Sequence, residues 1–382
     1  MADISFAIPS RVLFGLDSLN RIGNVVADHG DRAIVVTEAI LYESNTIERL
    51  QSVLEKRGVS FMVFDEVMPN ATSTVVDDGV HLARGAHANV VIGLGGVRAL
   101  STARCIAMVT PRNSHMEDYM AGIQPQGEAL PYIEVPTTCR NPFMLVDEYF
   151  VVDGRDRTGR PGRTQPDITK AVVIDPKLAI SLPQKYTATT LLDTLLGAIE
   201  GYTSTRANPL SDTLFAESIR IVAREHQAIV ESPDNLRART EAAMAGLLNA
   251  IGFSMSRQGM GAALAYAINA RFMVPKSWVA AILLPHVLEF HANATAEKSA
   301  AIASMLGEEV EGLTTVDASA RAADAARRLL ATHGLPSRLR EFGLSIEDML
   351  DVAGIARGYD IMNYVPRAAS TDDLYEVIKS AF

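Results

Sequence analysis

Two patterns follow one another along this chain, and their order limits the possible fold more than any other feature. Between residues 30 and 138, short β-branched runs alternate with helical stretches, which is typical of βαβ units in a parallel sheet. After Pro183, strand signals nearly vanish and apolar residues recur at helical spacing in segments between residues 187 and 306. The sequence therefore predicts an α/β domain with a parallel sheet over residues 1–180 and an all-helical domain over residues 181–382. The runs expected to form strands are 33–37, 61–64, 89–92 and 132–135, and the expected early helices are 46–56, 74–85 and 99–108.

The expected helices of the second half are 187–203, 211–231, 237–270, 279–292 and 295–306. Segment 145–174 differs from both halves. Two β-like runs, 148–152 and 171–174, flank a polar segment that is rich in glycine and arginine. We expect these two runs to pair as a long hairpin.

Composition and charge narrow the function classes. The net charge is −10 and no basic run occurs, so we expect small-molecule partners rather than nucleic acid or an acidic membrane. The two cysteines form no CxxC pair, which argues against a disulfide scaffold or a thiolate zinc site and favours a cytoplasmic protein. The N-terminus lacks a continuous apolar stretch, and the most apolar later segment, 279–290, contains Pro285 and His286, so neither a signal peptide nor a membrane span is expected.

A glycine-rich turn follows the third β-branched run. Gly93, Gly95 and Gly96 lead into an expected helix that begins near Arg98, where backbone amides and the helix dipole favour a phosphate. The alternative is a tight turn that only joins a strand to a helix. Glu38 follows the first run, where an acid accepts hydrogen bonds from ribose hydroxyls and favours NAD over NADP; alternatively it is a solvated acid at the start of a helix.

One carboxylate in the helical half lies in strongly apolar surroundings. Asp193 is flanked by leucines in the segment TATTLLDTLLGAIEGYTS, and a charge in such a setting needs a partner. Glu200 belongs to the same segment. Both acids are candidates for chemistry, and the alternative for both is a capping or salt-bridged acid.

Several motifs together resemble the iron-containing (group III) alcohol dehydrogenase family over essentially the whole chain. They are PSRVLFGLDSLNRIG, VVTE at 35–38, the glycine loop, VPTT at 135–138, VVIDPKL, LLDTLLGAIEGYTS and AAILLPHVLEF. The resemblance implies a dinucleotide-binding domain, a helical domain that carries a divalent metal, and a substrate cleft between them. It also implies an NAD(P)H cofactor, contacts from Thr137 and Thr138 beside Glu38 and the glycines, and a homodimer or higher homo-oligomer.

The chain departs from this family at the metal ligands. The family uses one Asp and three His; Asp193 matches the Asp, whereas the other positions carry Gly197, Ala262 and Lys276. Such a set cannot hold a divalent cation, so we expect no catalytic metal. The eight histidines contain no HxxxH pair to substitute. His291, where the family usually has Asn, either faces the cleft or is an ordinary helical histidine.

The cofactor side departs as well. Arg98 and Ser101 replace a serine and an acid of the family's GGGSxxD loop, and an arginine pairs with a phosphate as well as a serine does. PTTCRNPFM stands where the family has PTTxGTGSE, which introduces Arg140 and Phe143 near the expected nicotinamide pocket. Because of Glu38, we expect a slight preference for NADH over NADPH.

These departures suggest a replacement for the metal. Lys276 supplies a fixed positive charge beside Asp193, and Tyr266 donates a proton to a developing alkoxide. The alternative is that Lys276 neutralises Asp193 in a disused site and that Tyr266 is a core residue. Our first hypothesis is a metal-independent NAD(P)-linked oxidoreductase for a small carbonyl compound or alcohol. The second is non-redox chemistry (lyase, isomerase or cyclase) with Asp193, Lys276, Tyr266 and Arg140, and the third is a non-catalytic binding protein.

Overall fold

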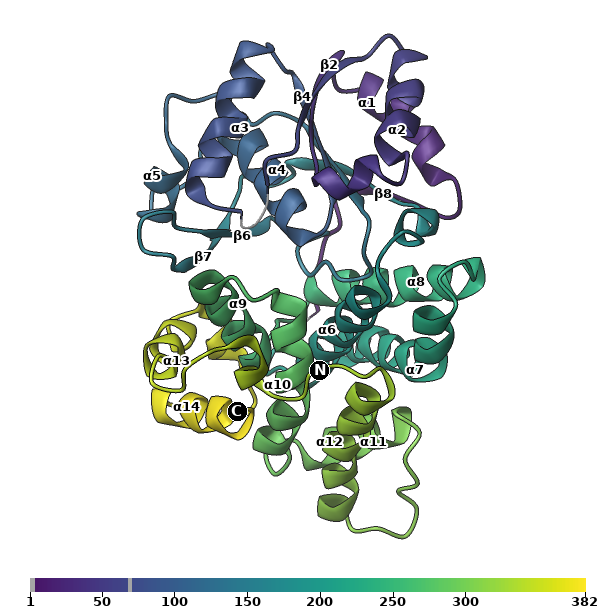
Figure 1. Ribbon diagram of the computed structural model, residues 1–382, viewed down its shortest axis with the longest axis vertical. Coiled ribbons are helices and arrows are strands. Elements are labelled where there is room, and N and C mark those ends of the chain that lie inside the picture. Colours follow the sequence, from purple (N-terminus) through teal and green to yellow (C-terminus); the bar gives the residue numbers. More distant parts are fainter. Residues whose placement is uncertain (1–3, 68–70) are drawn as a thin grey trace. The chain divides into compact units, whose positions relative to one another are not determined.

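The computed structural model describes residues 4–67 and 71–382 and consists of two compact units. One unit comprises Ala7–Ser181, here the sheet unit. The other comprises Leu182–Phe382 together with the chain up to Phe6, here the helical unit. Figure 1 shows the strands in the first and the helices α6 to α14 in the second. The predicted fold class, a parallel α/β domain followed by an all-helical one, is confirmed.

The sheet unit is built on six parallel strands in the order β1-β8-β5-β4-β2-β3. All four predicted strands occur. The sequence analysis did not predict β1, and it assigned the residues of β8 to a hairpin instead of to this sheet. β4 is buried at every residue, which explains its uninterrupted apolar sequence, because a parallel strand inside an α/β domain is covered on both faces. The strands are β1 Arg11–Phe14, β2 Arg32–Val36, β3 Ser60–Phe64, β4 Val90–Gly95, β5 Tyr132–Pro136 and β8 Thr169–Ile174.

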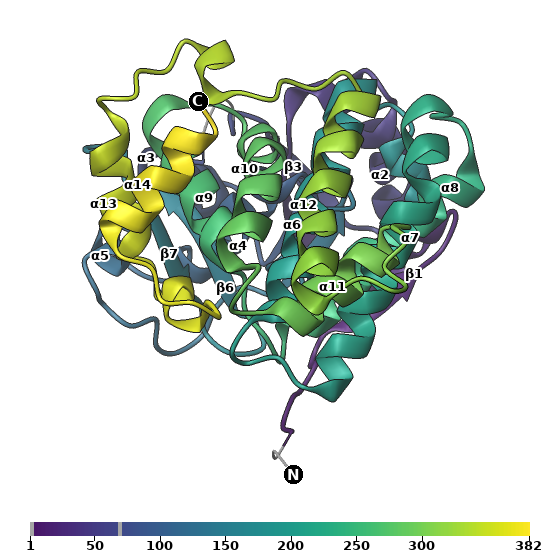
Figure 2. The ribbon, with the colours of Figure 1, turned by 90° about the horizontal axis from the view of Figure 1, so that it is seen from below.

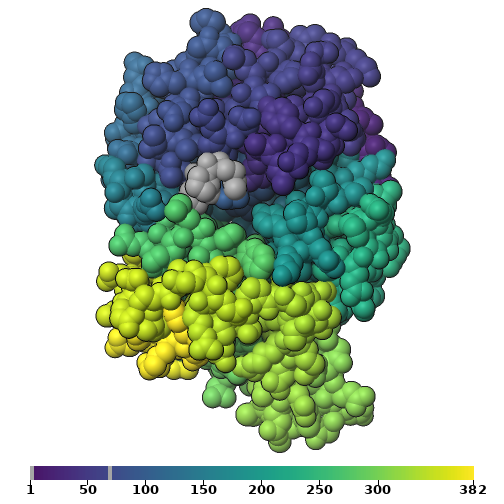
Figure 3. Space-filling model, viewed as in Figure 1, coloured from purple at the N-terminus to yellow at the C-terminus, as the bar shows by residue number. Residues whose placement is uncertain are grey.

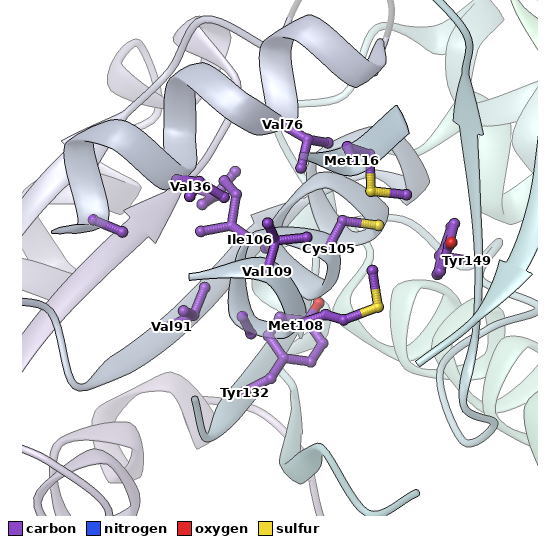
Figure 4. Close-up of a cluster of buried hydrophobic side chains, with 14 of the residues drawn as sticks. Val36, Val76, Val91, Cys105, Ile106, Met108, Val109, Met116, Tyr132 and Tyr149 are labelled. Atoms are coloured by element: carbon purple, nitrogen blue, oxygen red, sulfur yellow. The ribbon is translucent and has the colours of Figure 1, made fainter. Parts of the chain in front are cut away.

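Helices cover both faces of this sheet and form two apolar cores. α1 (Ile22–Ala27) and α2 (Thr46–Glu55) pack on one face. α3 (Ser73–Gly85), α4 (Val97–Val109) and α5 (Met116–Met120) pack on the other. Figure 4 shows this second core, where residues of α4 such as Ile106 and Met108 meet side chains of the strands.

The expected hairpin between 148–152 and 171–174 is wrong. β6 (Glu148–Val152) pairs instead with β7 (Gly159–Arg163), antiparallel, whereas β8 joins the parallel sheet between β1 and β5. The physical reason lies in the residues: β8 is apolar on both faces and suits the sheet interior, while β7 reads GRPGR and carries almost no strand signal.

The strand order reverses direction between β2 and β4, since the chain passes from β2 outward to β3 and from β4 outward to β5. In open α/β sheets, ligands bind outside the carboxyl ends of the strands at such a switch point. Glu38 follows β2, and the glycine-rich turn ends β4. Both candidate elements therefore lie at the expected ligand-binding edge of the sheet.

The helical unit is layered around three central helices: α6 (Gln184–Thr203), α9 (Met260–Phe272) and α10 (Lys276–His291). Figure 2 shows them between α7 and α8 on one side and α13 and α14 on the other. On the face in Figure 3, the green-yellow to yellow residues that form α11 to α14 lie at the surface. The remaining helices are α7 Pro209–Glu231, α8 Leu236–Phe253, α11 Ala296–Met305, α12 Thr315–Thr332, α13 Met349–Arg357 and α14 Thr371–Ser380.

The apolar stretch 237–270 forms two helices, α8 and α9, rather than one. The chain leaves helical conformation after Phe253 and starts again at Met260, where a carboxylate from α6 receives the first amides of α9. In the described residues, no helix is both long and apolar enough to span a bilayer.

Candidate functional site

The carboxyl ends of β2 and β4 bring together three residues that the sequence singled out for cofactor binding. Oε2 of Glu38 accepts a hydrogen bond from the Gly96 amide at 3.1 Å. Oε1 of the same carboxylate lies 3.7 Å from Nη2 of Arg98. Gly96 is the N-cap of α4, so the carboxylate lies at the positive end of that helix dipole. The structure thus joins Glu38, Gly96 and Arg98 in one cluster.

The three glycines of the turn have different physical roles. A Cβ at Gly93 would lie 2.7 Å from the Tyr132 hydroxyl oxygen, so this glycine allows close packing of β4 against its neighbours. Gly95 has φ +151, and a Cβ there would lie 2.9 Å from that of Ala99 and 3.2 Å from Oε2 of Glu38. The structural interpretation therefore holds for Gly93, which is required by packing. Phosphate binding by Gly95 and Gly96, which are buried at the ligand-binding edge, stays a prediction.

The threonines of the VPTT motif lie beside this turn. The amide of Thr137 donates to the carbonyl of Gly95 at 3.0 Å, which ties the end of β5 to the end of β4. The hydroxyl of Thr138 donates to the carbonyl of Arg140 at 3.2 Å. Arg140 is buried and belongs to the sheet unit, and its proposed catalytic role stays a prediction.

A buried ion pair that sequence reasoning missed holds the loop after β5. Nη2 of Arg104 in α4 lies 2.8 Å from Oε2 of Glu134 in β5, and each side chain is only 1% exposed. The Asn141 side-chain amide donates to Oε1 of the same carboxylate, and Arg104 also donates to the carbonyls of Val146 and Glu148. The signal was present in the sequence, because a glutamate inside the apolar run YIEVP needs a buried partner.

The helical unit brings Asp193, Lys276 and Tyr266 together from three helices. Nζ of Lys276, the first residue of α10, lies 2.5 Å from Oδ1 of Asp193 in α6. The same nitrogen lies 4.9 Å from the ring centroid of Tyr266 in α9, within the range of a cation–π contact. The side chains of Asp193 and Lys276 are 2% and 12% exposed, so this pair is shielded from bulk water.

The tyrosine hydroxyl has a defined partner. Oη of Tyr266 donates to Oε1 of Gln258 across a long contact of 3.5 Å, and both residues are buried. Gln258 lies in the loop that separates α8 from α9. The phenol is therefore oriented by that loop, while its ring lies against the ammonium group.

Glu200 forms the N-terminal cap of α9 from the neighbouring helix α6. Its carboxylate accepts hydrogen bonds from the amides of Gly259 at 2.9 Å, Gly261 at 2.5 Å and Ala262 at 3.3 Å. Burial raises the pKa of Glu200, and these amides and the charge of Lys276 oppose the rise. A Cβ at Gly259 would lie 3.1 Å from Oε1 of Glu200, which leaves little room there for any larger residue.

The residues at the four expected ligand positions do not fit a divalent metal. Asp193 is the one anionic donor, and its closest charged partner is the ammonium of Lys276. Gly197 and Ala262 carry no donor side chain, and a cationic lysine repels a second cation. Throughout residues 4–67 and 71–382, no group of three or more His, Cys, Asp or Glu is placed to hold a metal ion.

His291 lies near the end of α10 and is buried. Burial, with the nearby charge of Arg367, lowers its pKa to about 4, so the ring is neutral at pH 7. It packs edge-on against the ring of Phe290, with centroids 5.0 Å apart. His291 is therefore a buried helical histidine whose Nδ1 has no hydrogen-bond partner in the structure, and its position relative to a cleft stays a prediction.

Chemically, the helical cluster combines a fixed cation with a proton donor. An ammonium beside a phenol stabilises the phenolate that remains after the proton leaves, and it attracts an oxygen that gains negative charge. Asp193 holds the ammonium in place. The sheet unit contributes a glycine turn with an acid and an arginine at the switch point, a setting typical of dinucleotide binding.

Comparison with known proteins finds family matches that cover both units of the chain. A family model described as iron-containing alcohol dehydrogenase matches residues 9–176, and one described as the C-terminal part of the Fe-containing alcohol dehydrogenase family matches residues 187–382. The chain is 29% identical to a 1,3-propanediol dehydrogenase of Citrobacter freundii over 99% of its own length and 98% of that protein. It is 24% identical to an NAD-dependent methanol dehydrogenase of Bacillus methanolicus, with 99% of both chains covered.

The fold comparison agrees. A crystal structure of 1,3-propanediol oxidoreductase superposes with a TM-score of 0.93 at 26% sequence identity, and all of both chains is covered. The two family models together span both units and reach the glycine turn as well as the Asp193 cluster. The chain therefore belongs to the iron-containing alcohol dehydrogenase family.

Proposed function

We propose that this protein is a metal-independent, NAD(P)-linked oxidoreductase that reduces a small carbonyl compound or oxidises the corresponding alcohol. The alcohol-oxidoreductase class is supported by the family and by relatives such as 1,3-propanediol dehydrogenase. One observation supports the metal-independent part: the ammonium of Lys276 lies 2.5 Å from Asp193. The family resemblance assigns a histidine ligand to the position that Lys276 occupies.

In this mechanism, the chain's own residues handle the charge and the proton. When bound, a reduced nicotinamide supplies a hydride to the carbonyl carbon. Tyr266 donates its phenolic proton to the carbonyl oxygen as negative charge develops there, and Lys276 stabilises the phenolate that remains. Asp193 keeps the ammonium in position. In the oxidation direction the phenolate accepts the alcohol proton, so the same two residues serve both directions.

The sheet unit is proposed to hold the nucleotide. Gly95 and Gly96 allow close approach of a pyrophosphate to the start of α4, with Thr137 and Thr138 beside the turn and Arg98 available to pair with a phosphate. Glu38 favours NADH over NADPH, because a carboxylate accepts a hydrogen bond from a ribose 2′-hydroxyl and repels a 2′-phosphate. A relative that is named an NAD-dependent methanol dehydrogenase supports this choice.

The test begins with chelator-treated protein whose metal content has been measured. We expect it to bind NADH saturably and to reduce short aldehydes or ketones without added metal. The substitution Tyr266→Phe should lower kcat by about 10²- to 10⁴-fold, since it removes the proton donor, while the Kd for NADH stays the same. Lys276→Met should also lower kcat.

Lys298 offers a matched control within the helical unit. Its Nζ lies 4.6 Å from the ring centroid of Tyr202 and 3.0 Å from a carboxylate oxygen of Asp212, which reproduces the same combination of residue types. The substitution Lys298→Met should leave turnover unchanged. Turnover that needs added metal, or that survives both Tyr266→Phe and Lys276→Met, would contradict the mechanism.

A non-redox reaction of the lyase, isomerase or cyclase type is the second candidate. The observation that favours it is the buried, bulky segment that carries Arg140 and Phe143, at a position where the resemblance implies small residues. Under this candidate Asp193, Lys276, Tyr266 and Arg140 act on a substrate without hydride transfer. Absence of NADH and NADPH binding would favour it over the reductase, and absence of turnover on any substrate class would favour a non-catalytic binding protein. A homodimer or higher assembly and a cytoplasmic location remain predictions.

A further inference from the structure

Two histidines from distant parts of the helical unit meet at their ring nitrogens. Nδ1 of His226, in α7, lies 3.0 Å from Nε2 of His333, the residue that follows the last residue of α12. The ring centroids are 5.1 Å apart, and the ring planes are inclined by 82°. The contact is therefore made through the two nitrogens and not by stacking. Neither the proposed reaction nor the cap of α9 uses this pair.

Both rings are suited to act as ligands at neutral pH. Each is half-buried. Burial lowers the pKa of both imidazoles, so both are neutral at pH 7, and the charge of Glu231 opposes this shift. A neutral imidazole carries one proton and one lone pair on its two nitrogens, and its proton can move to the other nitrogen without loss from the ring. Both lone pairs can thus point into the contact with no net release of a proton.

The surroundings of the pair favour a cation. Glu231 is the last residue of α7, and its carboxylate is close enough to raise the pKa of both rings through its charge. His333 lies at the carboxyl end of α12, where the helix dipole is negative. Two neutral rings next to a carboxylate and a negative helix end attract a positive ion.

We propose that His226 and His333 bind a divalent transition-metal ion, with Zn²⁺ as the best fit. A tetrahedral ion with Zn–N bonds of about 2.0–2.1 Å holds two nitrogens about 3.3 Å apart, so the rings need to separate by only a few tenths of an ångström. Imidazole nitrogen suits Zn²⁺, whereas Mg²⁺ and Ca²⁺ prefer oxygen. Water or the Glu231 carboxylate completes the shell, since the described residues hold no group of three ligands already in position.

This site goes beyond the proposed oxidoreductase function and does not rest on it. The catalytic cluster is built on α6, α9 and α10, whereas this pair joins α7 to the end of α12. α7 packs mainly on α6 and α8, and α12 packs on α10 and α11, so an ion at the pair adds a direct link between two layers of the helical unit. Because the two nitrogens lie together only in the folded chain, the ion stabilises the folded state.

The experiment uses the full-length protein after chelator treatment, with zinc chloride as the probe. Calorimetric titration and metal analysis should show one equivalent of zinc per chain that binds at least about tenfold more tightly than any further zinc. His226→Gln and His333→Gln keep a polar side chain beside the remaining ring, and each should weaken this binding by more than about tenfold, because one of two ligands is lost. Zinc should raise the thermal unfolding midpoint of the wild type but not that of either variant.

His81→Gln is the matched control. His81 is an exposed histidine of α3 in the sheet unit, so its substitution removes one imidazole without touching the pair. This variant should keep the tightly bound zinc. Magnesium chloride in the same titration should not displace the zinc, because a hard cation prefers oxygen ligands.

The outcomes decide the inference separately from the proposed function. If the wild type binds no tight equivalent, if either His226→Gln or His333→Gln retains it, or if His81→Gln also loses it, the metal site is wrong. Turnover of the chelator-treated protein should be the same in the wild type and in both variants of the pair. A zinc requirement for turnover that persists in these two variants would contradict the metal-independent mechanism and leave this site standing.

Discussion

The ion pair between Lys276 and Asp193 makes a stability prediction that needs no substrate. Lys276→Met keeps a long, flexible side chain but removes the ammonium, so Asp193, which is 2% exposed, loses a cation at 2.5 Å. Removal of one partner of a buried ion pair typically costs about 3–5 kcal/mol. Since the Lys276 side chain is 12% exposed, we expect the free energy of unfolding to fall by about 3 kcal/mol, the lower end of this range. Asp193→Asn in the same background should recover most of it, because no charge then remains buried.

Trp278 provides the assay. It is the single tryptophan of the chain, lies in α10 two residues after Lys276, and packs against Phe342 with ring centroids 6.0 Å apart. Urea unfolding followed by its fluorescence therefore reports on the helical unit. Lys298→Met is the control, since its more exposed pair with Asp212 should contribute less than about 1 kcal/mol. If Lys276→Met costs no more than this control, or if the double variant is the sum of the singles, the pair is not the buried contact inferred here.

Three further predictions follow from buried groups. Glu134→Gln should lower the stability of the sheet unit by about 3 kcal/mol in thermal unfolding, since it leaves a buried arginine without its closest anion. His291 has a folded-state pKa of about 4 against 6.5 when free, so stability should fall as pH drops from 6.5 to 4; His291→Phe should flatten the unfolding free energy in this window. Histidines introduced together at Gly197, Ala262 and Lys276 should create a zinc site detectable by metal analysis, whereas Lys276→His alone should not.

The parts of the fold that could be predicted from sequence are those in which one segment carries its own signal. β4 is apolar at nearly every position, and its glycines mark where it ends, so it could be located without its neighbours. β7, in contrast, reads GRPGR and becomes a strand only because β6 supplies its partner. The mistaken hairpin arose because strand pairing depends on contacts between distant segments, which local pattern does not contain.

The residues of the candidate site also differ in whether a local sequence pattern was enough to predict them. Glu38 and the glycine turn were predictable, because the carboxyl ends of neighbouring parallel strands meet at one edge. The pairing of Asp193 with Lys276 was predicted only through the family resemblance, because Lys276 lies 83 residues away and the contact depends on how α6 and α10 pack. Glu200 is a capping acid, as the structural interpretation of the sequence allowed. The amides that donate to it belong to the start of α9, which the continuous apolar pattern of residues 237–270 did not reveal.

The proposed replacement of a divalent cation by Lys276 would change the chemistry that the cluster supports. A divalent ion beside Asp193 would leave a net charge of +1, whereas the ammonium of Lys276 leaves the pair neutral, and the buried Glu200 nearby adds no positive charge. A neutral pair stabilises an alkoxide less strongly than a net cation does, because the attraction scales with charge. In the proposed mechanism the oxygen must therefore take up a proton as the hydride arrives, and we assign that proton to Tyr266, whose ring lies 4.9 Å from the ammonium. On this argument Lys276 and Tyr266 are interdependent, and loss of either should remove most of the turnover that loss of both removes.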